Sequence, residues 1–196
     1  TDGERVLPLA SSQDHKRAYD HDRGPNTGGM GAYSPCPLVS EEKVAEIIDT
    51  VIRSMIRGMA KEGVPYRGVL YAGVMLTKNG PYVLEYNCRF GDPEAQAILP
   101  RLKSDLLPVL FQVAKGSLLL DSLQWQDKSC VAVVMASGGY PGFYHKGYVI
   151  QGIEKFHDQS ATQKADPRLL SGGQASFGGQ DLFVFHAGTA LDPDGH

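Results

Sequence analysis

Aliphatic side chains recur three and four residues apart between Ser40 and Gly63, a spacing that predicts an amphipathic helix. Ser40 is a favourable N-cap, and Glu41 and Glu42 follow in the first turn, where the helix dipole favours negative charge. Gly63 and the proline two residues later predict where the helix ends. The apolar face, which we expect to pack into the core as scaffold, consists of Val44, Ile47, Ile48, Val51, Ile52, Met55, Ile56 and Met59.

A hairpin is predicted directly after this helix. Residues 68–76 form a nearly continuous apolar run, which predicts a strand covered on both faces. The dipeptide Asn79-Gly80 predicts a tight turn, and Pro81 opens the return strand. Along this return strand Tyr82, Leu84, Tyr86, Cys88 and Phe90 alternate with Val83, Glu85, Asn87 and Arg89. Because strand side chains alternate between faces, the two sets lie on opposite sides, with Cys88 expected as a core thiol.

The remaining sequence predicts shorter elements. Residues 94–116 have a helical pattern, interrupted near Pro100 and Pro108. Beyond Ser129 the pattern indicates a buried strand at 130–137, turns at 138–147, and short strands at 148–153 and 181–191, separated by a flexible insertion at 155–180. We therefore expect an α+β fold with a boundary near residues 123–128, which divides the chain into residues 1–125 and a β-rich module over residues 126–196.

Composition and charge exclude several classes of function. The 196 residues carry a net charge of −3 and contain no long basic run, which argues against a nucleic-acid partner. The chain contains no apolar stretch of the roughly 18 residues that a membrane span requires, and no secretion signal at its start. Its three cysteines lie far apart, which favours a cytoplasmic location and argues against a thiolate zinc site.

Glycine is concentrated in one place. Four glycines (24, 28, 29 and 31) fall within eight residues of the glycine loop, which we define as residues 24–35. We expect this segment to be neither helix nor strand. Its backbone N–H groups could converge on an anion, although a tight turn between two elements would need the same residues. The spacing matches no standard dinucleotide or P-loop motif.

The trio Glu85-x-Asn87-x-Arg89 predicts a site that binds a metal and phosphate, because strand side chains alternate between faces and this spacing puts all three on one face. A carboxylate and an amide oxygen are hard ligands suited to Mg²⁺. A guanidinium beside them can offset the charge of a transferring phosphoryl group. The alternative from the residues alone is an ordinary solvated strand face.

A second polar segment precedes the glycine loop. Asp14, His15, Lys16 and Arg17 could bind a phosphate or a carboxylate, or could form internal ion pairs on a solvated loop. His15 and His21 have no spacing typical of zinc ligands. The sequence also contains no G-x-S-x-G nucleophile motif.

The chain contains a series of distinctive strings. In order they are SQDHKR, GPNTGGMGAYSP, YAGVML, LEYNCRFGDPE and LKSDL, followed by MASGGYPGFYHKG and VFHAGTAL. In order and spacing they resemble the glycinamide ribonucleotide synthetase (phosphoribosylamine–glycine ligase) family, ATP-grasp enzymes of purine synthesis. The resemblance implies the large catalytic half of an ATP-grasp fold, followed by an incomplete β-rich C-terminal module. It further implies that ATP drives the joining of glycine to 5-phosphoribosylamine through a glycyl phosphate.

The resemblance also assigns residues. Glu85 and Asn87 match the positions of the Mg²⁺ or Mn²⁺ ligands. Arg89 matches an arginine that lies beside the phosphates in related ATP-grasp enzymes, and Asp92 is assigned to catalysis with it. The segments expected to bind substrate and phosphate contribute Asp14, Lys16, Arg17, Asn26, Thr27, Gly28, Gly29, Met30 and Gly31.

Three departures from the family pattern are visible. Phe143 stands where the family usually has aspartate, and the insertion at 155–180 is longer than expected. The family's adenine-clamping region is mostly missing, so we expect this chain alone to be inactive. Whether the parent protein is a stand-alone ligase or is fused to other purine-pathway enzymes stays open. Two alternatives remain: another ATP-grasp carboxylate–amine ligase, or a non-catalytic module that binds phosphorylated metabolites.

Overall fold

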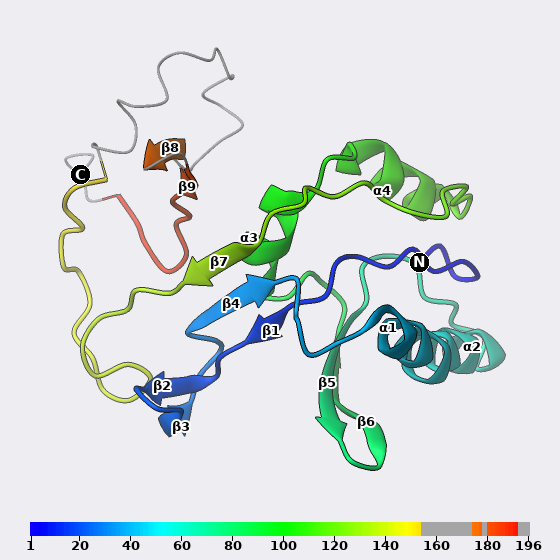
Figure 1. The fold of residues 1–196 in the computed structure, drawn as a ribbon, viewed down its shortest axis with the longest axis horizontal. Helices are drawn as coiled ribbons and strands as arrows, with labels where there is room; N and C mark the ends of the chain where they lie inside the picture. Colours follow the sequence, from blue (N-terminus) through cyan, green and yellow to red (C-terminus); the bar gives the residue numbers. More distant parts are fainter. Residues whose placement is uncertain (154–173, 178–179, 192–196) are drawn as a thin grey trace. The chain divides into compact units, whose positions relative to one another are not determined.

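The structure, a computed structural model, describes residues 1–153, 174–177 and 180–191. The chain divides into two compact units, Thr1–Ala136 and Ser137–His196 (Figure 1). The first unit ends later than the boundary predicted near residues 123–128, because strand β7 (Cys130–Val133) pairs with a strand of that unit. The assignment of residues 126–196 to a separate C-terminal domain stays a prediction. Among the described residues, none of the helices has the length and apolarity that a membrane-spanning helix needs.

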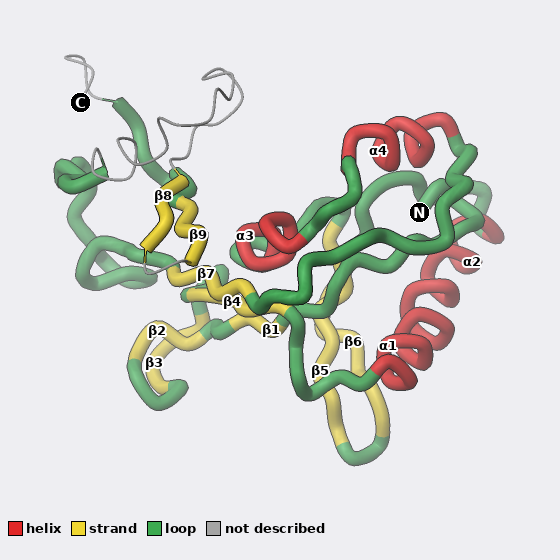
Figure 2. Tube along the Cα trace, turned by 45° about the horizontal axis from the view of Figure 1, so that its top comes forward, coloured by secondary structure: helices red, strands yellow, loops and turns green. Residues whose placement is uncertain are grey.

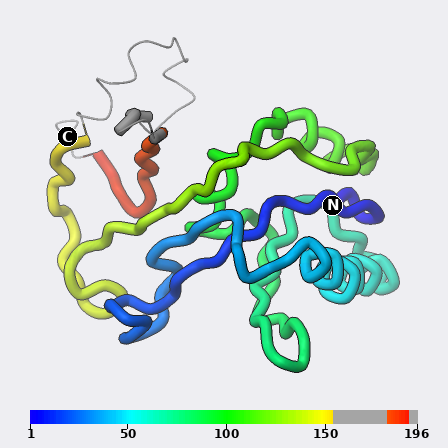
Figure 3. The backbone as a smooth tube through the Cα atoms, viewed as in Figure 1, coloured from blue at the N-terminus to red at the C-terminus, as the bar shows by residue number. Residues whose placement is uncertain are grey.

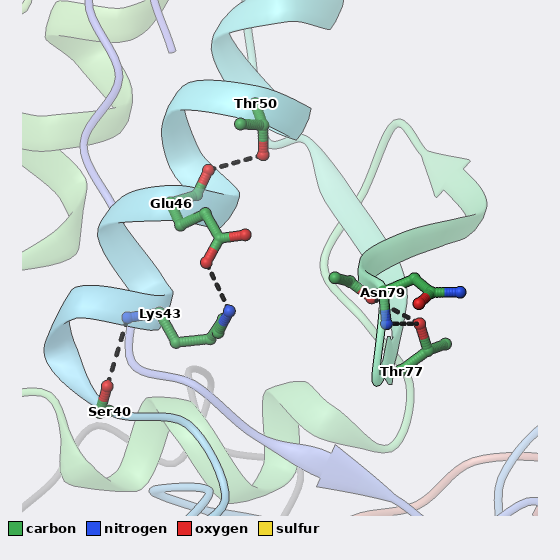
Figure 4. A network of polar contacts seen from close by, with 7 residues as sticks. Ser40, Lys43, Glu46, Thr50, Thr77 and Asn79 are labelled. Carbon is green, nitrogen blue, oxygen red and sulfur yellow. Dashed lines mark hydrogen bonds and ion pairs between the residues drawn. The ribbon is translucent and has the colours of Figure 1, made fainter.

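The predicted helix is present, in three consecutive parts. These are α1 (Glu41–Ile47), a π-helical turn (Ile48–Ile52) and α2 (Arg53–Lys61). The Ser40 hydroxyl oxygen accepts a hydrogen bond from the Lys43 N–H at 3.3 Å, which confirms the N-cap (Figure 4). At the other end Gly63 has a φ of +78°, and the following N–H, of Val64, donates to the Met59 carbonyl at 3.0 Å. Of the predicted apolar face, Val51 and Ile56 are fully buried.

The predicted hairpin consists of β5 (Tyr71–Thr77) and β6 (Gly80–Asn87), paired antiparallel. Its turn is Lys78–Asn79, one residue earlier than expected, and the Asn79 N–H donates to the Thr77 hydroxyl at 3.1 Å (Figure 4). The prediction that 68–76 is covered on both faces is wrong. The described residues form only a two-stranded sheet here, so its distal half has no further layer to bury it.

A β-bulge interrupts the predicted alternation of β6. Glu85 pairs with Gly73 and Val83 pairs with Val74, which leaves Leu84 without a partner in the ladder and 61% exposed. The strand then ends at Asn87, and the following residue, Cys88, is exposed rather than in the core. The expected single face from Tyr82 to Phe90 is therefore wrong, because cross-strand pairing sets where a strand bulges and ends.

A three-stranded antiparallel sheet, ordered β1-β4-β7, forms the centre of the first unit (Figure 2). Strand β1 is Gln13–Asp14 and the central strand β4 is Gly31–Ser34, with Ser34 0% exposed. The predicted buried strand at 130–137 is present only as β7, whose Val133 is 77% exposed. That prediction is wrong because β7 is the edge strand of the sheet, so hydrophobic composition alone did not bury it.

The glycine loop contains more regular structure than we expected. Strands β2 (Arg17–Tyr19) and β3 (Arg23–Asn26) form a two-stranded antiparallel hairpin, and β4 follows four residues later. Within this loop only residues 27–30 and Pro35 lie outside strands. The expectation of one continuous loop over residues 24–35 is therefore corrected: glycine's low strand propensity is overridden by pairing with neighbouring strands.

Residues 94–116 contain α3 (Glu94–Ile98), a 3₁₀ turn (Leu99–Arg101) and α4 (Leu106–Lys115). Pro100 lies in the 3₁₀ turn, as the predicted interruption requires. Pro108 does not interrupt a helix, because it lies in the first turn of α4, where its missing N–H breaks no helical bond. The N-terminal segment runs alongside α4 (Figure 3), and the core there contains Val109, Val113, Leu118 and Leu123, with Leu7, Leu9, Leu102, Leu106 and Trp125 packed against them.

The second unit shows the predicted turns. The N–H of Tyr140 donates to the Ser137 carbonyl at 3.2 Å, and that of Gly142 donates to the Gly139 carbonyl at 2.9 Å. Strands β8 (Gln174–Phe177) and β9 (Gln180–Phe183) pair antiparallel. The expected strand at 148–153 is not formed, and the one at 181–191 stops at Phe183. Residues 174–177 of the expected insertion are strand, and its remainder up to residue 179 lies outside the described residues.

Arg101 joins several segments of the first unit, although it is a buried cation. Its guanidinium donates to the Ser34 hydroxyl at 2.7 Å and to the Lys128 carbonyl at 2.6 Å, and its Cζ atom lies 5.9 Å from the centre of the Trp125 ring. Ser34 in turn donates to the Ser11 carbonyl at 2.7 Å. The charge is therefore solvated by protein oxygens, and a substitute without a hydrogen-bond donor would leave those acceptors unpaired.

We predict that Arg101→Met lowers the free energy of unfolding by about 3 kcal/mol, because the buried oxygens that accept from Arg101 then have no hydrogen-bond donor. Urea unfolding followed by circular dichroism measures this loss. Lys103→Met, at an exposed nearby position, is the control and should change stability by less than about 0.5 kcal/mol. A loss of under about 1 kcal/mol in Arg101→Met would contradict the role of the network.

Asp2 ties the N-terminus to the end of α4. Its carboxylate accepts hydrogen bonds from the N–H groups of Glu4, Arg5 and Leu118 at 3.1, 2.8 and 2.9 Å. Burial alone opposes ionisation, but the hydrogen bonds from Arg5, Leu118 and Glu4 outweigh it, so the pKa of Asp2 lies below its usual value. A carboxyl with a lowered folded-state pKa stabilises the fold above its unfolded pKa, and this contribution is lost as pH falls through the folded value.

We predict that Asp2→Asn costs about 1.5–3 kcal/mol at pH 7, because an amide nitrogen cannot accept the Leu118 N–H. The difference from wild type should shrink below about pH 4, where the unfolded-state carboxyl protonates. Urea unfolding of both proteins across this pH range measures the difference. A penalty that stays constant with pH would show that the charge of Asp2 contributes nothing.

Candidate functional site

Strands β5 and β6 place Glu85 and Asn87 two residues apart on one face. Their ladder partners are Gly73 and Tyr71, respectively. A Cβ atom on Gly73 would lie 3.2 Å from Cγ of Glu85, so the glutamate side chain lies over the glycine backbone. Within the described part of the chain, neither the Glu85 carboxylate nor the Asn87 amide is engaged in a side-chain hydrogen bond. The two oxygen donors are therefore available to a ligand.

Arg89 does not share this strand face. It lies in the bend after β6, and its exposed guanidinium donates to the neighbouring Phe90 carbonyl at 2.8 Å. Asp92 follows in the same segment, where its carboxylate accepts a hydrogen bond from the Gln96 amide at 2.9 Å. The prediction that all three residues of the trio align is wrong, because β6 ends at Asn87.

Lys16 and Asp14 form an ion pair beside the hairpin, with 2.8 Å between Nζ and Oδ2. The hydrogen bond to Asp14 raises the pKa of Lys16, partial burial opposes this, and the negative charges of Asp14, Glu85 and Glu94 raise the pKa further. Lys16 therefore lies within the electrostatic reach of carboxylates from β1, β6 and α3. Part of the polar segment before the glycine loop is thus brought to the predicted metal ligands.

Tyr71 and Glu94 complete this cluster, and we did not predict either of them. The Tyr71 hydroxyl donates to Oε1 of Glu94 at 2.8 Å, and Glu94 is 4% exposed. Burial, the Glu94 hydrogen bond and the charges of Glu94, Asp14 and Glu85 raise the pKa of Tyr71, so the phenol stays protonated. Both residues lie within the strings YAGVML and LEYNCRFGDPE. The sequence signal that could have pointed to the pair is the acidic residue directly after Gly91-Asp92-Pro93, inside one of the family strings.

The backbone of residues 27–30 is largely engaged within the chain. The Thr27 and Met30 N–H groups donate to the Lys16 and His15 carbonyls, both at 2.7 Å. The Gly29 N–H donates to the Thr27 hydroxyl at 3.0 Å. These three groups do not converge on one anion, so of the two alternatives that the sequence left open they fit the tight turn, because residues of the neighbouring segment accept the Thr27 and Met30 N–H groups.

Close packing explains two of the glycines instead. Gly29 has a φ of +133°, and a Cβ there would lie 2.3 Å from Cδ of Pro93. A Cβ on Gly31 would lie 2.7 Å from the Ala132 carbonyl oxygen. The glycine loop therefore contacts the Asp92-Pro93 segment on one side and β7 on the other, which brings it next to the loop that carries Asp92.

The other predicted phosphate-binding residues differ in how exposed they are. Arg17 is exposed in the β2–β3 hairpin, and its guanidinium donates to the Gly24 carbonyl at 2.7 Å. Asn26 and Gly28 are exposed, whereas Thr27, Met30 and Gly31 are partly or fully buried. The Thr27 hydroxyl donates to the Lys16 carbonyl at 2.9 Å, so it helps to fix the backbone position of the lysine.

The donor set is compatible with a hard divalent cation. No group of three or more His, Cys, Asp and Glu side chains among the described residues is arranged to hold a metal. One carboxylate and one amide oxygen on a single strand face match the way Mg²⁺ binds through few protein ligands, with water and substrate phosphate completing its coordination. Oxygen donors of this kind suit Mg²⁺ or Mn²⁺ better than zinc or copper, which favour thiolate and imidazole ligands.

Comparison with known proteins agrees with this geometry. Residues 1–95 match the model of the phosphoribosylglycinamide synthetase ATP-grasp (A) domain. The chain is 48% identical over 193 residues to the phosphoribosylamine–glycine ligase of Rhizobium meliloti, covering 97% of this chain and 45% of that protein. Residues 1–95 belong to the ATP-grasp domain of the phosphoribosylglycinamide synthetase family. The resemblance that the sequence strings indicated is thereby confirmed.

Two further relatives are also much longer than this chain. The human trifunctional purine biosynthetic protein adenosine-3 is 50% identical over 192 residues, covering 97% of this chain and 17% of that protein. The crystal structure of phosphoribosylamine–glycine ligase from Thermotoga maritima matches with a TM-score of 0.63 and 37% identity, covering 74% of this chain and 36% of that one. The chain thus spans less than half the length of each of these three relatives.

We predict that Gly29→Ala destabilises this synthetase domain by about 2 kcal/mol or more, because alanine is strained at φ +133° and collides with Pro93. Gly58→Ala is the matched control. No atom lies within 4 Å of a Cβ at Gly58, and alanine should stabilise helix α2 by about 0.5–1 kcal/mol. Chemical unfolding measures both. Equal effects of the two substitutions would contradict the packing role of Gly29.

Proposed function

We propose that the chain contains the catalytic half of an ATP-dependent phosphoribosylamine–glycine ligase, followed by a β-rich C-terminal module. The single observation that carries the proposal is the pair of unengaged oxygen donors, Glu85 and Asn87, on one face of β6 in a synthetase-family domain. The substrates are glycine, 5-phosphoribosylamine and ATP, and the products are glycinamide ribonucleotide, ADP and phosphate.

The reaction has two steps. A carboxylate oxygen of glycine attacks the γ-phosphorus of ATP, ADP leaves, and glycyl phosphate forms. The amine of 5-phosphoribosylamine then attacks the acyl carbon, the amide bond forms, phosphate leaves and the amine loses a proton. Because glycyl phosphate is hydrolysed by water, the site must exclude solvent until the amine arrives.

Charge is the main obstacle to the first step, since both reactants are anions. Glu85 and Asn87 would hold Mg²⁺ or Mn²⁺, which supplies Lewis-acid neutralisation of the phosphate oxygens when bound. Lys16, held by Asp14, adds a cation within reach of Glu85. Arg89 lies in an exposed bend two residues past Asn87, so it can turn toward a phosphate once its hydrogen bond to the Phe90 carbonyl breaks.

The remaining residues would line the substrate side. Asp92 is oriented by Gln96 and lies in the segment that packs against Gly29, so it can face a ligand held by the glycine loop. Asn26 and Gly28 are exposed there, and Thr27, Met30 and Gly31 hold the backbone in place. Arg17 would contribute from the β2–β3 hairpin. We assign these residues to binding of substrate and phosphate.

We make two wider proposals, on the location of the protein and on whether it is fused to other enzymes. The three cysteines are free thiols, which is compatible with a reducing cytoplasm. Some relatives are trifunctional purine biosynthetic proteins and others are named as ligases alone, so the parent chain is proposed to be either a stand-alone synthetase or the synthetase part of a fused enzyme.

We predict that Glu85→Ala in the full-length protein lowers glycine-dependent ADP release by at least about 100-fold at ordinary magnesium, because charge at the transferring phosphoryl group is then uncompensated. A coupled ADP assay with glycine and 5-phosphoribosylamine measures the rate. Glu62→Ala, exposed at the end of α2, is the control and should keep wild-type activity. Undiminished activity in Glu85→Ala would refute the metal assignment. Equal turnover with other acids or amines would refute the substrates.

A further inference from the structure

Tyr71 lies between the strand that carries the proposed metal ligands and the loop that follows it. It is the ladder partner of Asn87. One edge of its ring borders Gly73, where a Cβ would lie 3.6 Å from Cε1. The other edge borders Gly91, where a Cβ would lie only 2.9 Å from Cε2. The ring therefore fills the space between β5–β6 and the Gly91-Asp92-Pro93 segment.

Glu94 anchors the far end of this phenol. Its carboxylate is almost completely buried and accepts the Tyr71 hydroxyl at 2.8 Å. A Cβ on Gly91 would lie 2.5 Å from Oε2 of Glu94, so the carboxylate packs directly on the loop backbone. A buried carboxylate destabilises the fold unless it accepts hydrogen bonds. The Tyr71 hydroxyl, which belongs to the residue opposite Asn87, supplies one of these bonds. Because directly paired residues of an antiparallel ladder share a face, the Tyr71 side chain lies on the face of Asn87 and Glu85, and its hydroxyl would lie 3.7 Å from a Cβ on Gly73.

We propose that Tyr71 and Glu94 form a positioning pair that fixes the loop of Arg89 and Asp92 relative to the Glu85–Asn87 strand. This inference rests on the proposed metal site. The hydroxyl connects a strand residue opposite Asn87 to the start of α3, and the bend between them contains Arg89 and Asp92. Without the hydrogen bond, β6 and the loop can move independently, and the metal ligands lose their fixed relation to the phosphate-binding side chains.

The test uses the full-length protein with Tyr71→Phe, which removes only the hydroxyl. Direct binding of Mn²⁺ is followed by electron paramagnetic resonance, and ligase rates are measured against magnesium concentration. We expect the Mn²⁺ dissociation constant and the magnesium concentration for half-maximal rate each to rise about 10-fold. Tyr82→Phe, 55% exposed on the same hairpin, is the matched control and should change neither.

Variants at Glu94 separate positioning from charge and from simple loss of folding. Glu94→Gln keeps an acceptor oxygen for the phenol and should stay within about threefold of wild type, whereas Glu94→Ala should match Tyr71→Phe. Thermal unfolding of each variant confirms that the fold is retained. If Glu94→Gln loses Mn²⁺ as strongly as Glu94→Ala, with unchanged melting temperatures, the carboxylate acts through its charge and the positioning role is refuted.

The two proposals fail in different ways. If Tyr71→Phe binds Mn²⁺ as wild type does, while Glu85→Ala abolishes binding, the positioning pair is refuted and the metal site stands. If wild type and Glu85→Ala bind Mn²⁺ equally, the metal site itself is refuted and the positioning pair falls with it. Weakened binding in Tyr71→Phe and Glu94→Ala, with near-normal binding in Glu94→Gln, supports the pair.

Discussion

Close packing around strand β4 is the constraint that holds the first unit together. Gly31 leaves no room for a side chain against the Ala132 carbonyl, and Ser34 is fully buried between the Ser11 carbonyl and the Arg101 guanidinium. These contacts connect β4 to β7, to the segment before β1, and to the 3₁₀ turn. A short strand thereby fixes the position of elements that lie far apart along the chain.

The same strand links the candidate site to the core. Residues 27–30 of the glycine loop lead directly into β4, and Gly29 lies against Pro93 just before α3. On the other side β1 carries Asp14, whose ion pair keeps Lys16 near Glu85. The loops of the site are thus positioned by backbone contacts with a buried strand rather than by their own hydrogen bonds alone, as the precise geometry of a charged site requires.

Features governed by local rules could be predicted from the sequence. The helix from Ser40 to Gly63 depends on periodicity and capping within one segment, and the hairpin depends on a turn and two adjacent strands. Features that depend on distant partners could not. The bulge at Leu84 and the end of β6 removed Arg89 from the expected face, and the edge position of β7 left Val133 in solvent. No spacing rule contains that information.

Residue order alone was enough to indicate the synthetase family, the placement of Glu85 and Asn87 on one strand face, and the amphipathic helix, because each rests on residues close together in the chain. The tertiary structure decided what the glycines do and which polar groups pair. Tyr71 meets Glu94 across 23 positions, and Arg101 meets Ser34 across 67. Such pairs form only when packing has brought separate elements together, since burial strengthens a hydrogen bond and penalises any polar group left without one.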